Sequence, residues 1–155
     1  MILHHSYEQR LYDRDVTLQF LDKEPGFSGS AEAVLQSQLS AMHQGDLDWW
    51  LRTWDEEASA RYAKIYRLGS PERQTLLRQW QGAIGSVRST GLIRWILTGQ
   101  YVVVTYRLEG VASAPESAVA FHLSNGLWKA TLDLQQDPVF LHYSDGVDRI
   151  DRVVR

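Results

Sequence analysis

Residues 88–143 decide the fold, because they contain the alternating segments RSTGLIRWILTG (88–99), YVVVTYRLEG (101–110), ESAVAFHLS (116–124) and LWKATLDLQQ (127–136). Apolar residues at every second position are typical of strands whose two faces meet different surroundings. Gly99-Gln100 and Asn125-Gly126 separate the closest segments, and Asn-Gly is a strong hairpin signal. The stretch therefore predicts an antiparallel sheet.

The period of two also predicts which side chains share the apolar, inner face of the sheet. They are Ile93, Trp95, Leu97, Val102, Val104, Tyr106, Leu108, Val119, Phe121, Leu123, Trp128, Ala130, Leu132 and Leu134. This set contains no Asp, Glu, His, Lys or Arg. We therefore expect an inner face that is poor in groups for acid–base chemistry.

The opposite, outer face is more polar. It carries Arg94, Tyr101, Thr105, Arg107, His122, Lys129, Thr131 and Asp133, with the apolar Leu92, Ile96 and Val103 among them. This face is either solvated or an interaction surface. Exposed apolar side chains on neighbouring strands would favour pairing with a second molecule.

The residues before the sheet show helical spacing. Residues 31–44 follow a plausible N-cap, Ser30, and end at Gly45, which can adopt a left-handed cap. Asp46 can then cap a second helix, in which Leu47, Trp50, Leu51 and Trp54 form one apolar stripe. Trp49 lies off this stripe, so it either packs under a terminal segment or anchors a partner.

Two further helical pieces follow. Residues 57–68 either continue the second helix or form a separate one. Ser70-Pro71 is a strong helix start, and the apolar residues after it keep helical spacing up to Gly85.

Helices followed by consecutive antiparallel strands indicate an α+β fold. We expect N-terminal helices packed on a curved, mainly antiparallel sheet of four to six strands, in a single domain over residues 31–143. Residues 1–30 are an N-terminal extension with a short strand at 16–21 (VTLQFL). Residues 139–143 (VFLHY) resume as an edge segment, and residues 144–155 form a charged tail.

Composition excludes several classes of function. The 155 residues have a net charge of −3 and no cysteine, so disulfides, thiolate catalysis and cysteine metal sites are absent. Neither a basic patch nor an apolar run of about 20 residues is present, so we expect no nucleic-acid partner and no membrane span. The start of the chain has no signal-peptide pattern, which favours a cytoplasmic protein. Phosphate-loop and nucleophile-elbow motifs are missing and the five histidines lack ligand spacing, so we expect no cofactor and no metal.

The order of these pieces resembles the nuclear transport factor 2-like superfamily, which includes ketosteroid isomerase-like proteins. The pieces that match are GDLDWWLRTWDEEA (45–58), SPERQTLLRQW (70–80), YVVVTYRLEG (101–110) and NGLWKATLDL (125–134), and the resemblance covers roughly 31–142. It implies a cone in which helices close over a curved sheet, with a pocket between the two. Many members are dimers; some are enzymes and many only bind or scaffold.

Six tryptophans form either a bulky core or an aromatic-lined pocket. The pocket candidates are Trp50, Trp54, Tyr66, Trp80, Trp95, Tyr106, Phe121 and Trp128. The interface candidates are Trp49, Arg94, Tyr101, Arg107, His122, Lys129 and Asp133.

These residues favour a non-catalytic domain, homodimeric through the sheet face or edge, that binds a small apolar ligand or a protein partner. A second hypothesis is an isomerase- or dehydratase-like enzyme, in which Asp133, His122, Asp46 or Asp55 supplies the acid or base. A third is an assembly or immunity-type protein that uses Trp49 and the tail as contacts.

Overall fold

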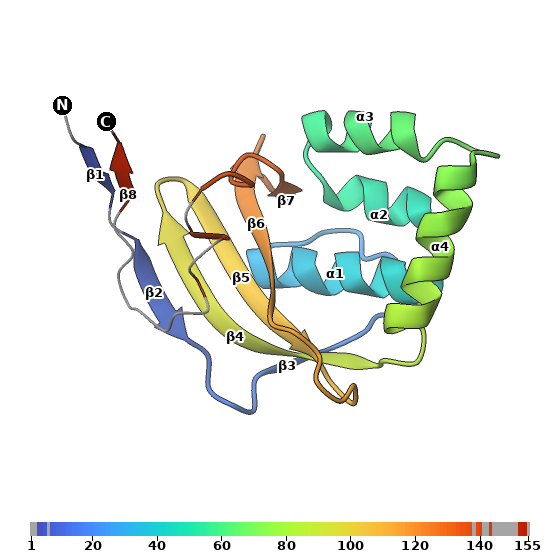
Figure 1. Ribbon diagram of the computed structural model, residues 1–155, viewed down its shortest axis with the longest axis horizontal. Coiled ribbons are helices and arrows are strands. Elements are labelled where there is room, and N and C mark those ends of the chain that lie inside the picture. The colour runs from blue at the N-terminus through green and yellow to red at the C-terminus, as the bar shows by residue number, and fades with distance from the viewer. Residues whose placement is uncertain (1–2, 6, 138, 141–142, 144–151, 155) are drawn as a thin grey trace.

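The computed structural model of the chain describes residues 3–5, 7–137, 139–140, 143 and 152–154. Its fold is α+β, with helices packed on a curved antiparallel sheet (Figure 1). The helices are α1 (Ala31–Gln44), α2 (Leu47–Thr53), α3 (Glu56–Ile65) and α4 (Pro71–Ile84).

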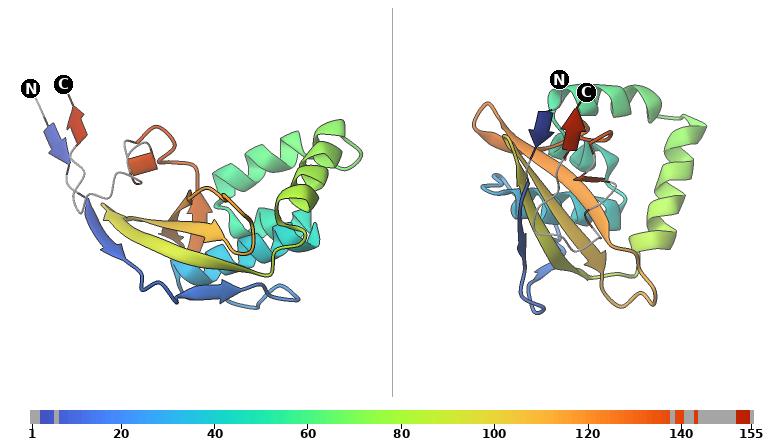
Figure 2. Two further views of the ribbon diagram at one scale, coloured as in Figure 1. Left: turned by 60° about the horizontal axis from the view of Figure 1, so that its bottom comes forward. Right: turned by 60° about the vertical axis from the view of Figure 1, so that its left-hand side comes forward.

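The strands form one large sheet and one small one. Their bounds are β1 (Leu3–His5), β2 (Glu8–Leu11), β3 (Thr17–Gln19), β4 (Ser89–Thr98), β5 (Tyr101–Leu108), β6 (Ser117–Ser124), β7 (Leu127–Thr131) and β8 (Arg152–Val154). The large sheet has the order β2-β4-β5-β6-β7, and β3 pairs with β4 beyond β2. Strands β1 and β8 pair with each other at the end of the molecule farthest from α4 (Figures 1 and 2).

The helix boundaries agree with the capping residues in the sequence. Ser30 accepts a hydrogen bond from Ala33 N–H, and Gly45 ends α1 with a φ of 68°. Asp46 caps α2 and Ser70 caps α4 in the same way as Ser30. Residues 57–68 do not continue α2, because Asp55 starts a separate helix, α3. Side-chain caps therefore set every helix start in this layer.

The inner face of the sheet is covered by the helices. Helix α1 packs on β5, β6 and β7, and α2 and α4 pack on α1. Val102, Val104, Phe121 and Ala130 are buried in this core, and the rest of the predicted inner set on β4–β7 packs against it except Ile93 and Leu123. The alternation therefore predicted the inner face correctly for most of its length.

Four predicted positions on that face are not part of the core, and one of them is Leu132, which follows the end of β7 and lines two pockets. The β4–β5 register shifts between Leu92 and Arg94, and this bulge turns Leu92, rather than Ile93, toward the helices. Leu123 is 57% exposed, because it lies near the tip of the β6–β7 hairpin. Leu134 follows the end of β7 and packs on the outer face instead.

The outer face is covered by the chain itself, so the predicted exposed patch is wrong. Ile96 and Val103 are fully buried there, with Tyr7 and Val139 packed over them. Tyr7 donates a hydrogen bond of 2.5 Å from its hydroxyl to Asp137, which joins the two covering segments. This cover removes the reason for expecting a homodimer through this patch.

The terminal segments differ from expectation in two places. The strand expected at 16–21 is confirmed as β3, but β2 was missed because EQRL has no apolar alternation. Val139 and Phe140 have helical backbone rather than strand; residues 138, 141 and 142 of that segment lie outside the described residues. Of the expected tail, only 152–154 is described, as β8.

Among the described residues, no helix combines the length and the apolar composition needed to cross a membrane.

Substitution of two glycines by alanine should change stability in opposite directions, because only one of them has a positive φ. Gly126 has a φ of 79° in the β6–β7 turn, whereas Gly82 lies in α4 with open space where a Cβ would stand. We expect Gly126→Ala to lower the free energy of unfolding by about 1–2 kcal/mol, and Gly82→Ala to raise it by about 1 kcal/mol. Urea unfolding of both variants measures the two changes, and equal effects in one direction would contradict this account of the turn.

Candidate functional site

The aromatic residues under the helices form a packed cluster centred on Trp50. The Trp50 ring lies 4.9 Å from Tyr62, 5.2 Å from Trp80 and 5.6 Å from Trp54, measured between ring centroids. Edge-to-face and tilted contacts of this kind stabilise aromatic cores. The cluster therefore fills the space under the helical layer around Trp50.

The pocket candidates divide between this core and its rim. Trp50, Trp80 and Phe121 are buried, whereas Trp54, Tyr66, Trp95, Tyr106 and Trp128 are partly buried and pack against the same core. Five pockets on the described residues have volumes between about 240 and 540 Å³, and Trp50, Trp80, Trp95, Tyr106 and Phe121 line none of these five. Trp54 and Trp128 are brought together at one pocket, and Tyr66 lines another, with α4.

Tyr106, on the inner face of the sheet, is not suited to act as a general base. Burial raises the pKa of its hydroxyl to about 12, although a hydrogen bond with Ser117 partly lowers it. The phenol therefore stays neutral near pH 7, as a group that packs and donates.

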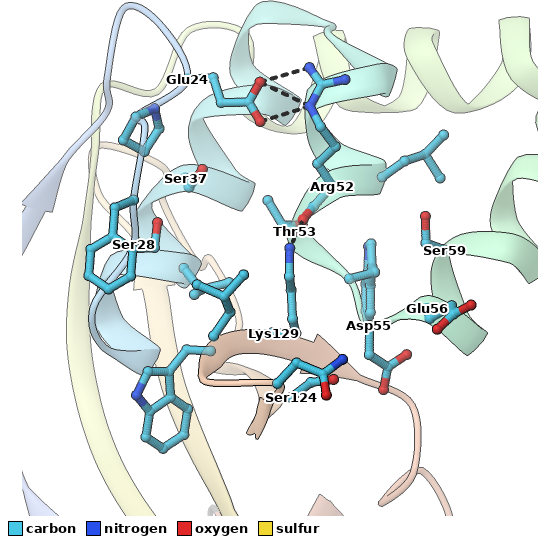
Figure 3. A pocket seen from close by; sticks show the side chains of 18 of the residues that line it. Glu24, Ser28, Ser37, Arg52, Thr53, Asp55, Glu56, Ser59, Ser124 and Lys129 are labelled. Carbon is cyan, nitrogen blue, oxygen red and sulfur yellow. Dashed lines mark hydrogen bonds and ion pairs between the residues drawn. The ribbon is translucent and has the colours of Figure 1, made fainter.

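We name the pocket between Trp54 and Trp128 the hairpin pocket. It has a volume of about 490 Å³ and three walls (Figure 3). The walls are residues 24–28 with Val34 and Ser37 of α1, residues 51–56 with Ser59, and residues 124–125 with 127–129 of the β6–β7 hairpin. Its size is within the range of small-molecule sites.

The central wall exists because α2 ends by joining the sheet. Trp54 has an extended backbone and forms a parallel bridge with Ala130 of β7. Asp55 N–H then donates to the Ala130 carbonyl at 2.7 Å. Lys129 Nζ donates to the carbonyl of Arg52, also at 2.7 Å, and so places a cation at the C-terminus of α2.

A surface ion pair holds the first wall. Arg52 makes hydrogen bonds of 2.7–3.0 Å to both carboxylate oxygens of Glu24 (Figure 3). The Arg52 side chain is 57% exposed and that of Glu24 is 35% exposed, so the pair contributes little to stability. Its effect is to position the 24–28 loop beside the pocket.

A second polar cluster lies at the sheet edge behind the central wall. Asp55 Oδ2 lies 3.0 Å from His122 Nε2, and both side chains are mostly buried. The His122 ring stacks on Tyr101, whose hydroxyl donates to Asp133 at 2.8 Å. Tyr101, His122 and Asp133 are therefore brought together by the sheet, and Asp55 joins them from the junction between α2 and α3.

The Asp55 carboxylate is stabilised in its charged form. Desolvation, the largest single effect, raises its pKa, but hydrogen bonds from Ala58 N–H, Thr131 and His122, with the His122 charge, together hold the pKa below its ordinary value. A carboxylate already saturated with donors is a poor proton acceptor. The cluster is therefore suited to attaching α3 to the sheet rather than to proton abstraction.

The other interface candidates have partners within the chain. Arg94 forms a 2.8 Å ion pair with Glu116 in which both side chains are about 10% exposed. Arg107 donates from Nε to the Ala114 carbonyl at 3.0 Å and remains exposed. Neither arginine joins the cluster around His122 through these contacts.

Trp49 is not an exposed anchor, and that prediction is corrected. It is 1% exposed, and its indole N–H donates to Ser37 of α1 at 2.8 Å. The apolar stripe of α2 identifies only the helix face that carries Trp50 and Trp54. Helix α1 also buries the neighbouring face of α2, which carries Trp49. The contact joins two helices, and no periodic pattern in the sequence indicates it.

Among the described residues, no three His, Cys, Asp or Glu side chains are placed to hold a metal ion. Comparisons with family models, curated proteins and solved structures gave no match.

Asp55→Asn tests the attachment of α3. Asn caps a helix as well as Asp does, so the change removes mainly the charge. We expect a loss of about 1–3 kcal/mol at pH 7, because a buried charged hydrogen bond is lost. The pKa of Asp55 is lower in the folded than in the unfolded chain, so its contribution is complete above about pH 4, the ordinary carboxyl range, and is lost as pH falls through the folded value.

Urea unfolding of wild type and variant at several pH values measures this difference. Asp22→Asn, in an exposed loop, is the matched control and should change stability by less than about 0.5 kcal/mol. A loss at pH 3 as large as that at pH 7 would contradict the charge-based explanation.

Proposed function

We propose that this protein is a non-catalytic binding domain whose hairpin pocket takes a small apolar ligand. The observation that carries the proposal is a group of large apolar side chains within the mixed polar and apolar lining of an open pocket. Trp54, Trp128 and Leu51 are partly buried there, while Phe27 is 69% and Leu127 42% exposed. Exposed large apolar groups gathered at one hollow are typical of a binding surface.

The charges around the pocket favour a neutral ligand. Glu24 pairs with Arg52, Lys129 is directed to the Arg52 carbonyl, and Asp55 is bound to His122. Glu56, exposed at the edge, is the remaining charged residue of the lining. Because most of these charged groups already have partners, a charged ligand would form few new ion pairs in the pocket. Apolar contact would therefore supply most of the affinity.

The same lining supports a partner protein as an alternative occupant. An apolar side chain of another protein, or of a second copy of this chain, would bury Phe27 and Leu127 as a small ligand does. The two cases differ in measurement: only the partner version changes the mass seen by light scattering at micromolar concentration.

An isomerase- or dehydratase-like enzyme is the second candidate, favoured by the Asp55–His122 pair. Against it, His122 is not among the residues that line the hairpin pocket, and the Asp55 carboxylate is engaged by several donors. We expect no faster deuterium exchange of cyclohexanone α-protons with the protein than without it. Exchange that is catalytic and lost in His122→Gln would favour the enzyme instead.

Titration with the neutral fluorescent probe N-phenyl-1-naphthylamine tests the binding proposal. We expect saturable binding that Phe27→Ala weakens about fivefold, since the ring supplies part of the apolar contact. Leu68→Ala is the matched control, because Leu68 is 88% exposed and lies outside the pocket. Absence of saturable binding, or equal weakening by both variants, would contradict the proposal.

A further inference from the structure

A second groove lies on the outer face of the sheet, away from the hairpin pocket. It has a volume of about 540 Å³ and is formed where β2 and β3 meet across β4, with the end of β5 and the start of the loop after it. Its lining includes Leu11, Arg14, Gly91, Ile93, Arg107 and Val111. We name it the arginine groove.

The floor of the arginine groove is a glycine for which the fold supplies no conformational reason. Gly91 pairs with Thr17 on one side and Arg107 on the other, so these three positions form a row across the outer face. Its φ is not in the left-handed region, and a Cβ would meet only the Arg107 carbonyl oxygen, at 3.9 Å. Glycine weakens a strand interior, and there it often marks a bulge, such as the one that follows at Leu92–Arg94, or the close approach of a ligand or another backbone. The missing side chain keeps the floor open.

The walls of the groove are apolar and unusually exposed. Leu11 is 64% exposed and Val111 is 41% exposed. Ile93, the bulged residue of β4, lies between the strands at the same groove. The bulge therefore does two things: it turns Leu92 into the core and leaves Ile93 as part of the groove lining.

The charges of the groove are cationic, although the whole protein has a net charge of −3. Arg14 and Arg107 are both exposed lining residues. Arg107 uses Nε to hold the Ala114 carbonyl, which leaves its terminal nitrogens for another acceptor. Glu109 is the one carboxylate in the lining, and its Oε1 accepts from Ser89 at 3.2 Å. The groove lining therefore contains two guanidinium groups and one carboxylate, which gives it a net positive charge.

We propose that the arginine groove binds an anionic amphiphile, namely an apolar chain with a carboxylate headgroup. The chain lies over Gly91 between Leu11, Ile93 and Val111, and the carboxylate accepts hydrogen bonds from Arg14 and Arg107. Arginine pairs with carboxylates through two parallel N–H donors, which gives this headgroup its specificity. The inference concerns a different surface from the hairpin pocket and does not depend on the function proposed for it.

Titration with dodecanoate, below its micelle concentration, tests this site in the full chain. Calorimetry gives the affinity, and amide shifts of Gly91 and Gly110 in nuclear magnetic resonance give the location. We expect Gly91→Val to weaken binding at least tenfold by filling the floor, with an unchanged or higher melting temperature because valine suits a strand. Arg14→Gln and Arg107→Gln should each weaken it about tenfold, as loss of a charged hydrogen bond does.

Two controls separate this site from other modes of binding. Phe27→Ala, in the hairpin pocket, should leave dodecanoate affinity unchanged, and dodecyltrimethylammonium, which has the same chain and opposite charge, should bind at least tenfold more weakly. The proposal is overturned if dodecanoate does not bind, if Gly91→Val and both arginine variants bind it as wild type does, or if Phe27→Ala is the variant that weakens it. Equal affinity for the cationic amphiphile overturns the role of the two arginines.

Discussion

The hydrogen bond from Asp55 N–H to the carbonyl of Ala130 is the contact on which the rest of the arrangement depends. It turns the end of α2 into an extra edge beside β7, although the sheet is otherwise antiparallel. Because the backbone is fixed there, the Asp55 side chain can start α3 and reach His122 across the edge. The same junction places Trp54 between the aromatic core and the hairpin pocket. One backbone contact therefore connects the helical layer, the core and the candidate site.

Local features of the sequence were enough to predict α1, α2, α4 and both tight turns, but they left open whether residues 57–68 continue α2 or form a separate helix. Ser30, Gly45 and Ser70 determine helix ends through groups one to four residues away, so their effect can be recognised without the fold. Alternation likewise predicted that Val102, Val104 and Phe121 face inward. The failures are of another kind. The bulge at Ile93 depends on how β2, β3 and β5 share β4, and the burial of Ile96 depends on a segment some forty residues later. Neither relation leaves a periodic signal.

The sequence predicted some of the residues of the candidate site but not how they are arranged. Trp54 and Trp128 were chosen because they are large and inward, but the same criterion selected Trp50 and Phe121, which are core. Aromatic residues fill interiors and line pockets for one reason, their large apolar area. An aromatic residue belongs to the core when another ring packs against it, and it lines a pocket when the adjacent space is empty. Here the bridge between the end of α2 and β7 determines which of the two applies. His122 and Asp133 were recognised as a polar group on one face, whereas the partner Asp55 comes from a helix end.

The two faces of the sheet are held by different physical means, and this explains where ligand sites can form. The inner face is covered by large rings and aliphatic groups with few unmet polar atoms, among them the Trp54 indole N–H. The outer cover is smaller and partly polar: it relies on Tyr7–Asp137 and Arg94–Glu116, and it leaves Thr105 Oγ1 and both amide atoms of Gln9 buried without partners. A longer cover over Gly91 and Arg107 would have to bury arginines as well. The outer face remains open at that end because its charges make complete burial unfavourable.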